Sequence, residues 1–366
     1  MHILVLLTDL FDKLGGIQTF NRSLVKSLSN IAEHRGWKVT LLVLNDKGNN
    51  TISDFYINRS KVKYLSFNGS KFKFIISAIL NALHSSIIVI GHVNYSPLAG
   101  ILRLFSVKAK LYLIVFGIDV AGKLPCFQRF SLRHLTKIVS ISEYTKNQIL
   151  LFNSFEKSKF CIMPCTLEPF FDEKSSYKDR NDLSLPSGKM ILTVSRLEAH
   201  ERYKNIDLVI EAMPGILKEV PDAFYVVVGD GSDKKRLEKL AKNLSLAGKI
   251  IFTGKVSNEL LISYYKLCDL FILPSTQEGF GIVFLEAMYF AKPCIGANAG
   301  AVPEVVKDRE TGYLVEPEKK AISRSVTNLL QDDLLRDKIG KAGKERFEKE
   351  FSFVEFQKKI IAILCE

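Results

Sequence analysis

The chain has 366 residues, of which 47% are hydrophobic and 25% charged, and its formal net charge is +12. This length is too great for one ordinary core and predicts two domains of roughly 100–200 residues each, while the composition excludes a largely disordered chain. No uninterrupted apolar run reaches the roughly 18 residues of a membrane span, and no helix-turn-helix, RNP or zinc-finger pattern accompanies the positive charge, so no nucleic-acid partner is expected.

The first half of the chain alternates short β-rich apolar runs with helical patterns, which is typical of βα units around a parallel sheet. The apolar run at residues 2–8 lacks the basic leader and the small-residue cleavage site of a signal peptide. It is therefore expected to form the first strand. Helices are expected between the strands, for example over 17–33 and 143–151. The other strands of this half are expected at 37–44, 62–67, 86–91, 111–116, 137–141 and 160–163.

A polar stretch at 172–182 then interrupts the apolar rhythm and is the expected interdomain linker. The alternation restarts at residue 190, with strands expected at 190–194, 223–229, 249–253, 269–273, 293–296 and 312–315. The sequence therefore predicts an α/β fold of two Rossmann-like doubly wound domains, over residues 1–170 and 186–350. Ligands of such sheets bind in the loops outside the carboxyl ends of the strands.

The positive charge is concentrated in the first half of the chain. Residues 1–168 hold 21 Lys and Arg against 9 Asp and Glu, whereas residues 169–366 hold 30 of each. Over residues 59–74 the cations are interleaved with Phe and Tyr, a pattern that suits an anionic bilayer or an acidic acceptor better than nucleic acid. The alternative is a solvated face with Lys stems lying over apolar neighbours. We expect a positive electrostatic field with a functional role, because the excess of positive charge extends over half the chain.

Six cysteines are scattered along the chain, with no Cys-x-x-Cys pair and no histidine cluster beside them. They are interpreted as buried reduced thiols rather than metal ligands, which favours a cytoplasmic location. They stand at positions 126, 161, 165, 268, 294 and 365.

A pair of glycines, Gly15 and Gly16, follows the first expected strand and opens a helix. Glycine permits close backbone approach there, so the helix N-terminus can face a phosphate or a sugar oxygen. The G-x-G-x-x-G spacing of a dinucleotide site is absent, which disfavours a nicotinamide oxidoreductase. The alternative interpretation of the glycine pair is a simple turn.

Two cations follow the strand expected at 190–194: Arg196 directly after it, and Lys204 near the start of the next helix. An Arg fork and a Lys point charge at a strand's carboxyl end can grip a diphosphate, although either cation alone can be an ordinary surface charge.

The loop after the strand at 269–273 carries the strongest signal. Gly279, Phe280 and Gly281 free the backbone before an apolar helix, so the first amides of that helix can point at an anion. Glu286 lies within the apolar helix and is costly to bury without a partner. Ribose hydroxyls are suitable partners for this carboxylate, and a neighbouring cation is the alternative.

Together these segments resemble the GT4 family of retaining glycosyltransferases with the GT-B fold. The resemblance is most specific over 190–306 and rests on Arg196, Lys204, Gly229-Asp230-Gly231, residues 252–256, the pair Glu278 and Glu286 with seven residues between, and residues 300–304. It implies two Rossmann-like domains that face a central cleft, the first binding the acceptor and the second the nucleotide sugar. It also implies that a helix over 351–366 packs back on the first domain.

The resemblance implies a role for each matching position. The implied catalytic residues are Arg196 and Lys204, which neutralise the donor diphosphate, and Glu278. The implied donor site also contains Gly279, Phe280 and Gly281 with the sugar and phosphates, Glu286 at the ribose, Val256 at the base, and Gly16 from the other domain. Gly15, Asn94 and Asp119 are the expected acceptor residues.

Two positions depart from the family pattern. Family members often carry His-Gly after the strand expected at 111–116, whereas this chain has Phe116-Gly117 with Asp119 two places on. The histidine that would contact the sugar is therefore missing. A motif that often contains Asn-Gly is replaced by Pro164-Cys165-Thr166-Leu167-Glu168.

The resemblance implies retaining transfer of a hexosyl group from a nucleotide sugar, with UDP-glucose or a related UDP-hexose expected first. No two aspartates stand two positions apart, so the Asp-x-Asp metal motif is absent and we expect neither a metal ion nor a cofactor. The expected acceptor is a saccharide or lipid-linked oligosaccharide, or one bearing uronate or phosphate, reached from the cytoplasm by peripheral contact with an anionic membrane. The alternatives are a nucleotide-sugar 2-epimerase and a non-catalytic nucleotide-sugar-binding protein on an anionic surface.

Overall fold

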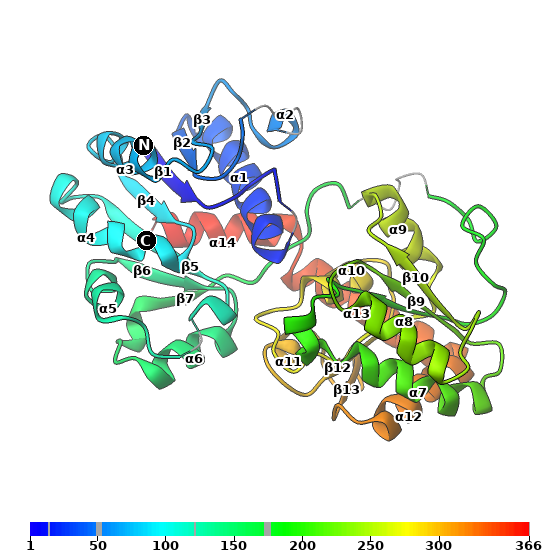
Figure 1. The fold of residues 1–366 in the computed structure, drawn as a ribbon. Coiled ribbons are helices and arrows are strands. Elements are labelled where there is room, and N and C mark those ends of the chain that lie inside the picture. Colours follow the sequence, from blue (N-terminus) through cyan, green and yellow to red (C-terminus); the bar gives the residue numbers. More distant parts are fainter. Residues whose placement is uncertain (14, 49–52, 121, 172–176, 366) are drawn as a thin grey trace. The chain divides into compact units, whose positions relative to one another are not determined.

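The computed structural model describes residues 1–13, 15–48, 53–120, 122–171 and 177–365. The chain divides into two compact units, one formed by Met1–Pro169 with Ser352–Glu366 and the other by Phe170–Phe351 (Figure 1). Each unit has its own parallel sheet, with helices on both faces. The expected α/β class with two Rossmann-like sheets is confirmed.

The sheet of the first unit has seven parallel strands in the order β3-β2-β1-β4-β5-β6-β7. Central β1 pairs with β2 on one side and with β4 on the other, so the winding direction reverses between β1 and β4. Such a reversal opens a crevice outside the carboxyl ends of the strands. The strands are β1 His2–Leu7, β2 Lys38–Val43, β3 Val62–Ser66, β4 Ile87–Ile90, β5 Lys110–Val115, β6 Lys137–Ser140 and β7 Phe160–Ile162.

Two groups of helices cover opposite faces of this sheet. Alternate strand residues such as Ile88 and Leu113 pack with α3, α4 and α5, whereas Val89 and Ile114 face α1 and α14. The helices are α1 Gly16–Arg35, α2 Ser53–Tyr56, α3 Lys71–Ala82, α4 Ser96–Phe105, α5 Cys126–Leu132, α6 Glu143–Phe152 and α14 Phe353–Cys365. Short 3-10 turns lie at Val93–Tyr95, Ile118–Val120 and Lys157–Lys159.

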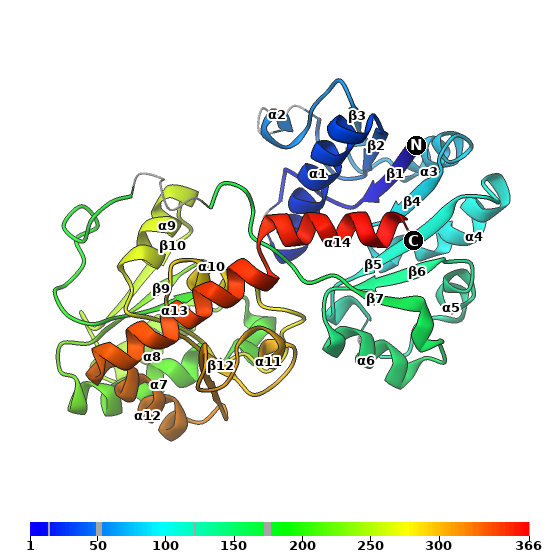
Figure 2. The same ribbon diagram turned by 180° about the vertical axis from the view of Figure 1, so that it is seen from behind.

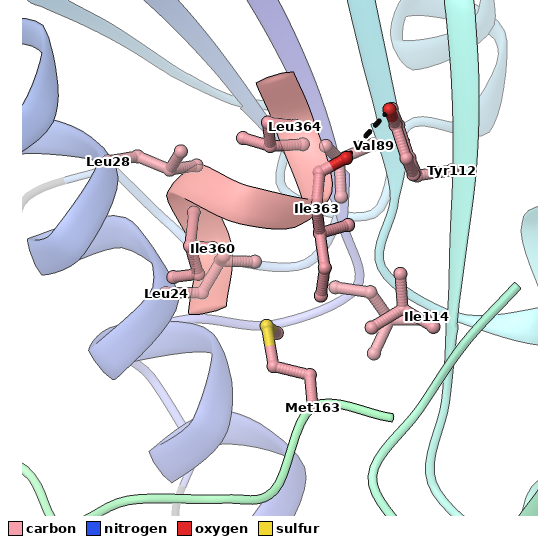
Figure 3. A pocket seen from close by; sticks show the side chains of 10 residues that line it. Leu24, Leu28, Val89, Tyr112, Ile114, Met163, Ile360, Ile363 and Leu364 are labelled. Carbon is pink, nitrogen blue, oxygen red and sulfur yellow. Dashed lines mark hydrogen bonds between the residues drawn. The ribbon is translucent and has the colours of Figure 1, made fainter. Parts of the chain in front are cut away.

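Helix α14 ends the chain but belongs to the first unit (Figure 2). Its buried residues Phe356, Ile360 and Leu364 follow helical spacing and point toward the sheet. The Tyr112 hydroxyl on β5 donates a hydrogen bond of 3.0 Å to the carbonyl of Ile363. Figure 3 shows the small apolar pocket in which Ile360 and Leu364 lie between α1 and the strands. The end of the chain therefore completes the core of the unit that contains its beginning.

The sheet of the second unit has six parallel strands in the order β10-β9-β8-β11-β12-β13. They are β8 Met190–Val194, β9 Phe224–Val228, β10 Ile250–Gly254, β11 Leu270–Leu273, β12 Cys294–Ala297 and β13 Gly312–Val315. The helices are α7 Ile206–Glu219, α8 Lys234–Asn243, α9 Asn258–Leu267, α10 Ile282–Tyr289, α11 Val302–Val305, α12 Lys319–Gln331 and α13 Asp333–Glu350, with a 3-10 segment at Ala199–Lys204.

The strand predictions are confirmed in both units, with ends that differ by about one residue. Of the expected linker, 172–176 lie outside the described residues and 177–182 pack on the second unit. There Arg180 donates to the carbonyls of Gly188 and Leu267 at 2.6 and 3.2 Å.

The prediction that all six cysteines are buried is partly wrong. Cys165, Cys268 and Cys294 are buried, but Cys126 and Cys365 are exposed because they lie at the first residue of α5 and the last residue of α14. None of the six cysteines, all of which lie in the described part of the chain, forms a disulfide bond. Within the described part of the chain, every helix is too short or too polar to cross a membrane.

Candidate functional site

The loop after β8 carries Arg196 and is fixed by two glycines of the loop after β9. Ser195 donates its amide to Val228, and Leu197 donates to Asp230, so the two loops continue the pairing of the strands. Gly229 and Gly231 have φ angles of +142° and +156°. A Cβ on them would lie only 1.8 Å from the Ser195 carbonyl oxygen and 2.3 Å from that of Leu197. Only glycine fits, because any side chain would displace the backbone beside Arg196.

Both predicted diphosphate cations are held by one buried carboxylate, Glu201. The Nζ of Lys204 lies 2.8 Å from its Oε2, and the Arg196 guanidinium pairs with its Oε1. The Arg196 side chain is 62% exposed and the Lys204 side chain 12%. Both cations are therefore anchored by Glu201, and Arg196 is the more accessible to solvent. Glu201 neutralises only one of the two positive charges. The remaining charge is available to an anionic ligand.

The loops after β8 and β11 are tied together, as expected for neighbouring parallel strands. The Thr276 amide donates to the carbonyl of Tyr203 at 2.9 Å, and the Asn205 side-chain amide donates to the carbonyl of Pro274 at 2.8 Å. Asn205 has a left-handed backbone (φ +56°), which turns the chain from the 3-10 segment into α7. These contacts bring the loop that carries Glu278 beside the cations.

Glu278 belongs to the same electrostatic group as Arg196 and Lys204. Loss of hydration raises the pKa of Glu278, and the nearby positive charges of Lys204 and Arg196 oppose this rise. Its backbone is gripped from the loop after β12, where the Ala301 amide donates to the Glu278 carbonyl at 2.9 Å. A Cβ on Gly300 would lie 2.8 Å from that carbonyl oxygen. The three predicted catalytic residues therefore lie together at the carboxyl edge of the second sheet.

Helix α10 begins directly after the predicted glycine loop. Gly281 caps it with a left-handed φ of +91°, and Phe280 is buried beneath the turn. Glu286 lies on this helix and is buried, and its Oε2 accepts a hydrogen bond of 2.5 Å from the Tyr265 hydroxyl on α9. Burial and the negative Glu286 raise the pKa of Tyr265 far above its ordinary value, so the phenol remains a proton donor. The carboxylate is thus oriented by a hydroxyl group.

The predicted base contact, Val256, lies two residues beyond β10 and is partly buried. Strand β10 is at the edge of the sheet, separated from β8 by β9. Val256 is therefore at the same edge as the cations but farther from the sheet centre.

The predicted acceptor residues follow three neighbouring strands of the first unit. Gly15 comes after β1, Asn94 after β4 and Asp119 after β5, so all three belong to the carboxyl edge of that sheet. Gly16 is the first residue of α1. Asn94 is exposed, and its backbone amide donates to Nδ1 of His92 at 3.1 Å.

Asp119 has a neighbour, His92, that the sequence analysis did not single out. Its Oδ1 accepts the Phe116 amide at 3.0 Å, loss of hydration raises its pKa, and the nearby His92 opposes this rise. His92 follows β4, and the pairing of β4 with β5 in the structure brings it beside Asp119.

The loop before Gly15 is braced by a buried ion pair. Arg22 on α1 donates to both carboxylate oxygens of Glu168 at 2.8 and 2.6 Å and to the carbonyl of Leu10 at 2.9 Å. Tyr56 adds a hydrogen bond of 2.5 Å to Glu168. The segment that replaces the family's Asn-Gly motif therefore ends in a carboxylate that braces the glycine loop.

Phe116, at the position of the missing histidine, is buried among aromatic side chains. Its ring meets Phe20 of α1 edge to face at 5.2 Å between centroids, and Phe20 meets Phe356 of α14 in the same way at 5.5 Å. The side chain at this position joins the core beneath α14.

Comparisons with known proteins found similar sequences and similar folds. Residues 176–346 match the family model of glycosyl transferases group 1. The chain is 33% identical over 195 residues to N-acetyl-alpha-D-glucosaminyl L-malate synthase of Bacillus anthracis, covering 51% of this chain and 49% of that protein. It is 30% identical over 181 residues to a GDP-mannose-dependent alpha-(1-6)-phosphatidylinositol monomannoside mannosyltransferase of Mycolicibacterium smegmatis, covering 47% of each. The chain spans about half the length of these curated relatives.

Solved structures match over the whole chain. HepE of Anabaena, solved in complex with UDP, aligns with a TM-score of 0.79 at 18% identity and covers 100% of both chains. Sucrose-phosphate synthase from Thermosynechococcus elongatus aligns with a TM-score of 0.76 at 20% identity and covers 99% of this chain and 98% of that one. At these identities the likeness shows the fold, whereas the similarity to a family rests on the sequence match over residues 176–346. Over residues 176–346 the chain is similar to the glycosyl transferases group 1, and each of its two units has the architecture of the GT-B fold.

Proposed function

We propose that the protein transfers a hexosyl group from a nucleotide sugar to a saccharide acceptor. The observation that carries this proposal is the group formed by Arg196, Lys204 and Glu278 at the carboxyl ends of β8 and β11, with both cations held by Glu201. The second unit binds the donor, and the carboxyl edge of the first sheet binds the acceptor.

The chemistry requires stabilisation of a leaving diphosphate. The bond between the anomeric carbon and the phosphate oxygen breaks, the acceptor oxygen bonds to the anomeric carbon, and the acceptor proton passes to the departing phosphate. Negative charge develops on that phosphate, where Arg196, Lys204 and the first amides of α10 stabilise it electrostatically. Attack from the side of the leaving group retains the anomeric configuration.

The donor assignment is UDP-glucose or a related UDP-hexose. It is supported by the fold match to HepE of Anabaena, which was solved with UDP-glucose. Glu286 takes the ribose hydroxyls in this proposal. Burial of a carboxylate without hydrogen-bond donors is costly. Tyr265 already donates to Glu286, and in this proposal the ribose hydroxyls donate to it as well.

We propose that transfer needs no metal ion. In the many nucleotide-sugar enzymes that use a divalent cation, an Asp-x-Asp pair carries it, and this sequence has no such pair. Two fixed cationic side chains supply the neutralising charge in its place.

The acceptor is proposed to be a saccharide or a lipid-linked oligosaccharide, or a saccharide that carries uronate or phosphate. The excess of Lys and Arg in residues 1–168 supports an acidic or membrane-borne acceptor. The protein then works from the cytoplasm by peripheral contact with an anionic membrane.

A thermal-shift panel of UDP-, GDP- and ADP-sugars, each with and without EDTA, tests the donor and the metal independence. UDP-hexoses should raise Tm most, and EDTA should leave both the shift and the transfer rate unchanged. Loss of activity in EDTA that magnesium or manganese restores would overturn metal independence.

NMR of the product's anomeric proton distinguishes retention from inversion. Incubation with the donor alone reveals a 2-epimerase, which needs no acceptor.

A further inference from the structure

Helix α3 has two apolar faces, of which only one is buried. Phe74, Ala78 and Ala82 pack against the sheet. The opposite side of the helix carries Phe72, Ile76, Leu80 and Leu83, which are 75%, 41%, 59% and 50% exposed. Spacings of three and four residues place these four side chains on one stripe. A helix that served only the core would carry polar residues there.

The two neighbouring helices repeat this pattern. Helix α4 contacts α3 on one side and α5 on the other, and all three cover the same face of the sheet. We call their outward side chains the α3–α5 face. It consists of Phe72, Ile76, Leu80, Leu83, Ile101, Leu104, Phe105, Val107, Phe127 and Phe130, all of them exposed. Leu104 is 78% exposed and Val107 73%, so the apolar character extends to the ends of the helices.

The charge around this face has one sign. Residues 55–142 contain 12 Lys and Arg, and their one acidic residue is Asp119. Asp119 lies after β5, at the carboxyl edge of the sheet, rather than on α3, α4 or α5. The exposed cations that lie in these three helices or within three residues of their ends are Lys71, Lys73, Lys108, Lys123 and Arg133.

We propose that the α3–α5 face docks on the surface of an anionic lipid bilayer. Large contiguous apolar surfaces with basic borders are typical of interfacial helices, whose Phe and Leu side chains enter the headgroup region while Lys and Arg contact lipid phosphates. A second copy of the chain fits poorly, because a twofold contact would set this face against itself and oppose like charges. In this proposal the α3–α5 face rests on the surface of the bilayer, and no segment crosses it.

This inference builds on the membrane contact in the proposed function, but its test measures binding rather than sugar transfer, so either can fail alone. The full chain is co-sedimented with vesicles of phosphatidylcholine containing 30% phosphatidylglycerol and with vesicles of phosphatidylcholine alone. Binding should require phosphatidylglycerol and should weaken by tenfold or more as salt rises from low to physiological concentration.

Two matched pairs of variants locate the surface. The double variant Phe72→Ser with Leu104→Ser should bind at least tenfold more weakly, and Leu334→Ser with Val354→Ser, which removes equally exposed apolar side chains elsewhere, should bind like the wild type. The triple variant of Lys71, Lys73 and Lys108 to Gln should lose most of the salt dependence. The same change at the exposed Lys218, Lys239 and Lys349 should not.

Three outcomes would overturn the proposal. One is the absence of wild-type binding to the phosphatidylglycerol vesicles. Another is equal loss of binding in the control and the face variants. The last is wild-type dimerisation in light scattering that Phe72→Ser with Leu104→Ser abolishes while vesicle binding stays unchanged, which would assign the face to a second copy.

Discussion

The two units have the same architecture but differ in how their surfaces are used. The second unit carries 28 positive and 28 negative residues over 170–351 and holds its key charges in a fixed group around Glu201. The first unit has excess positive charge, exposes a broad apolar face and departs from the family pattern at Phe116. The family model covers 176–346 and thus mainly the second unit. The sequence similarity thus lies in the unit with balanced charge, whereas the basic and apolar surfaces belong to the other unit.

The largest effect should come from removing the fixed cations of the second unit. Arg196→Ala with Lys204→Ala leaves Glu201 buried without these two partners and removes the charge that the proposed function assigns to the diphosphate. Loss of one preorganised donor typically lowers kcat by about 10²–10³, so kcat/KM should fall by at least 10³.

Lys218→Ala is the matched control for this change, since Lys218 is an exposed cation of the same unit on α7. Glu201→Gln should produce a smaller loss, because both cations remain but lose their anchor. Full activity in the double variant would remove the basis of the proposed donor site.

A second test concerns how the first unit is completed by the end of the chain. Ile360→Ala removes a buried side chain of α14, and such core truncations cost about 2–5 kcal/mol. Because α14 packs in the core of the first unit, one of two urea transitions should shift while the other stays in place. Val354→Ala, at an exposed position of the same helix, should change the free energy of unfolding by less than about 0.5 kcal/mol. Equal shifts of both transitions would show that the units do not unfold separately.

The smallest expected effect is a pH-dependent gain in stability at Glu278. Burial raises the pKa of this carboxyl, so folding favours its protonated form and loses stability as pH rises through the raised pKa. Glu278→Gln imitates the protonated form. It should raise Tm by a few degrees at pH 7.5, with the gain shrinking toward pH 4, and it should lower the transfer rate. A Tm difference that is the same at both pH values would contradict the raised pKa.

Much of the second unit could be predicted from sequence. The strands follow from short apolar runs bounded by turn residues, and their carboxyl ends identified the loops that carry Arg196, Lys204 and Glu278. Glu201 was missed because nothing in a charged run such as residues 196–204 indicates which carboxylate turns inward. Only the structure shows that both of its oxygens meet a cation.

The sequence by itself determined two parallel-sheet units, the carboxyl-edge loops and the charge asymmetry, because these depend on local periodicity and composition. Tertiary structure decided the Arg22–Glu168 pair, which joins residues 146 positions apart, and the packing of Phe116 against Phe20. It also decided which apolar face of α3 remains outside. The sequence of a helix that is apolar on both sides predicts that both sides are buried, whereas in the structure the sheet covers only one side of α3.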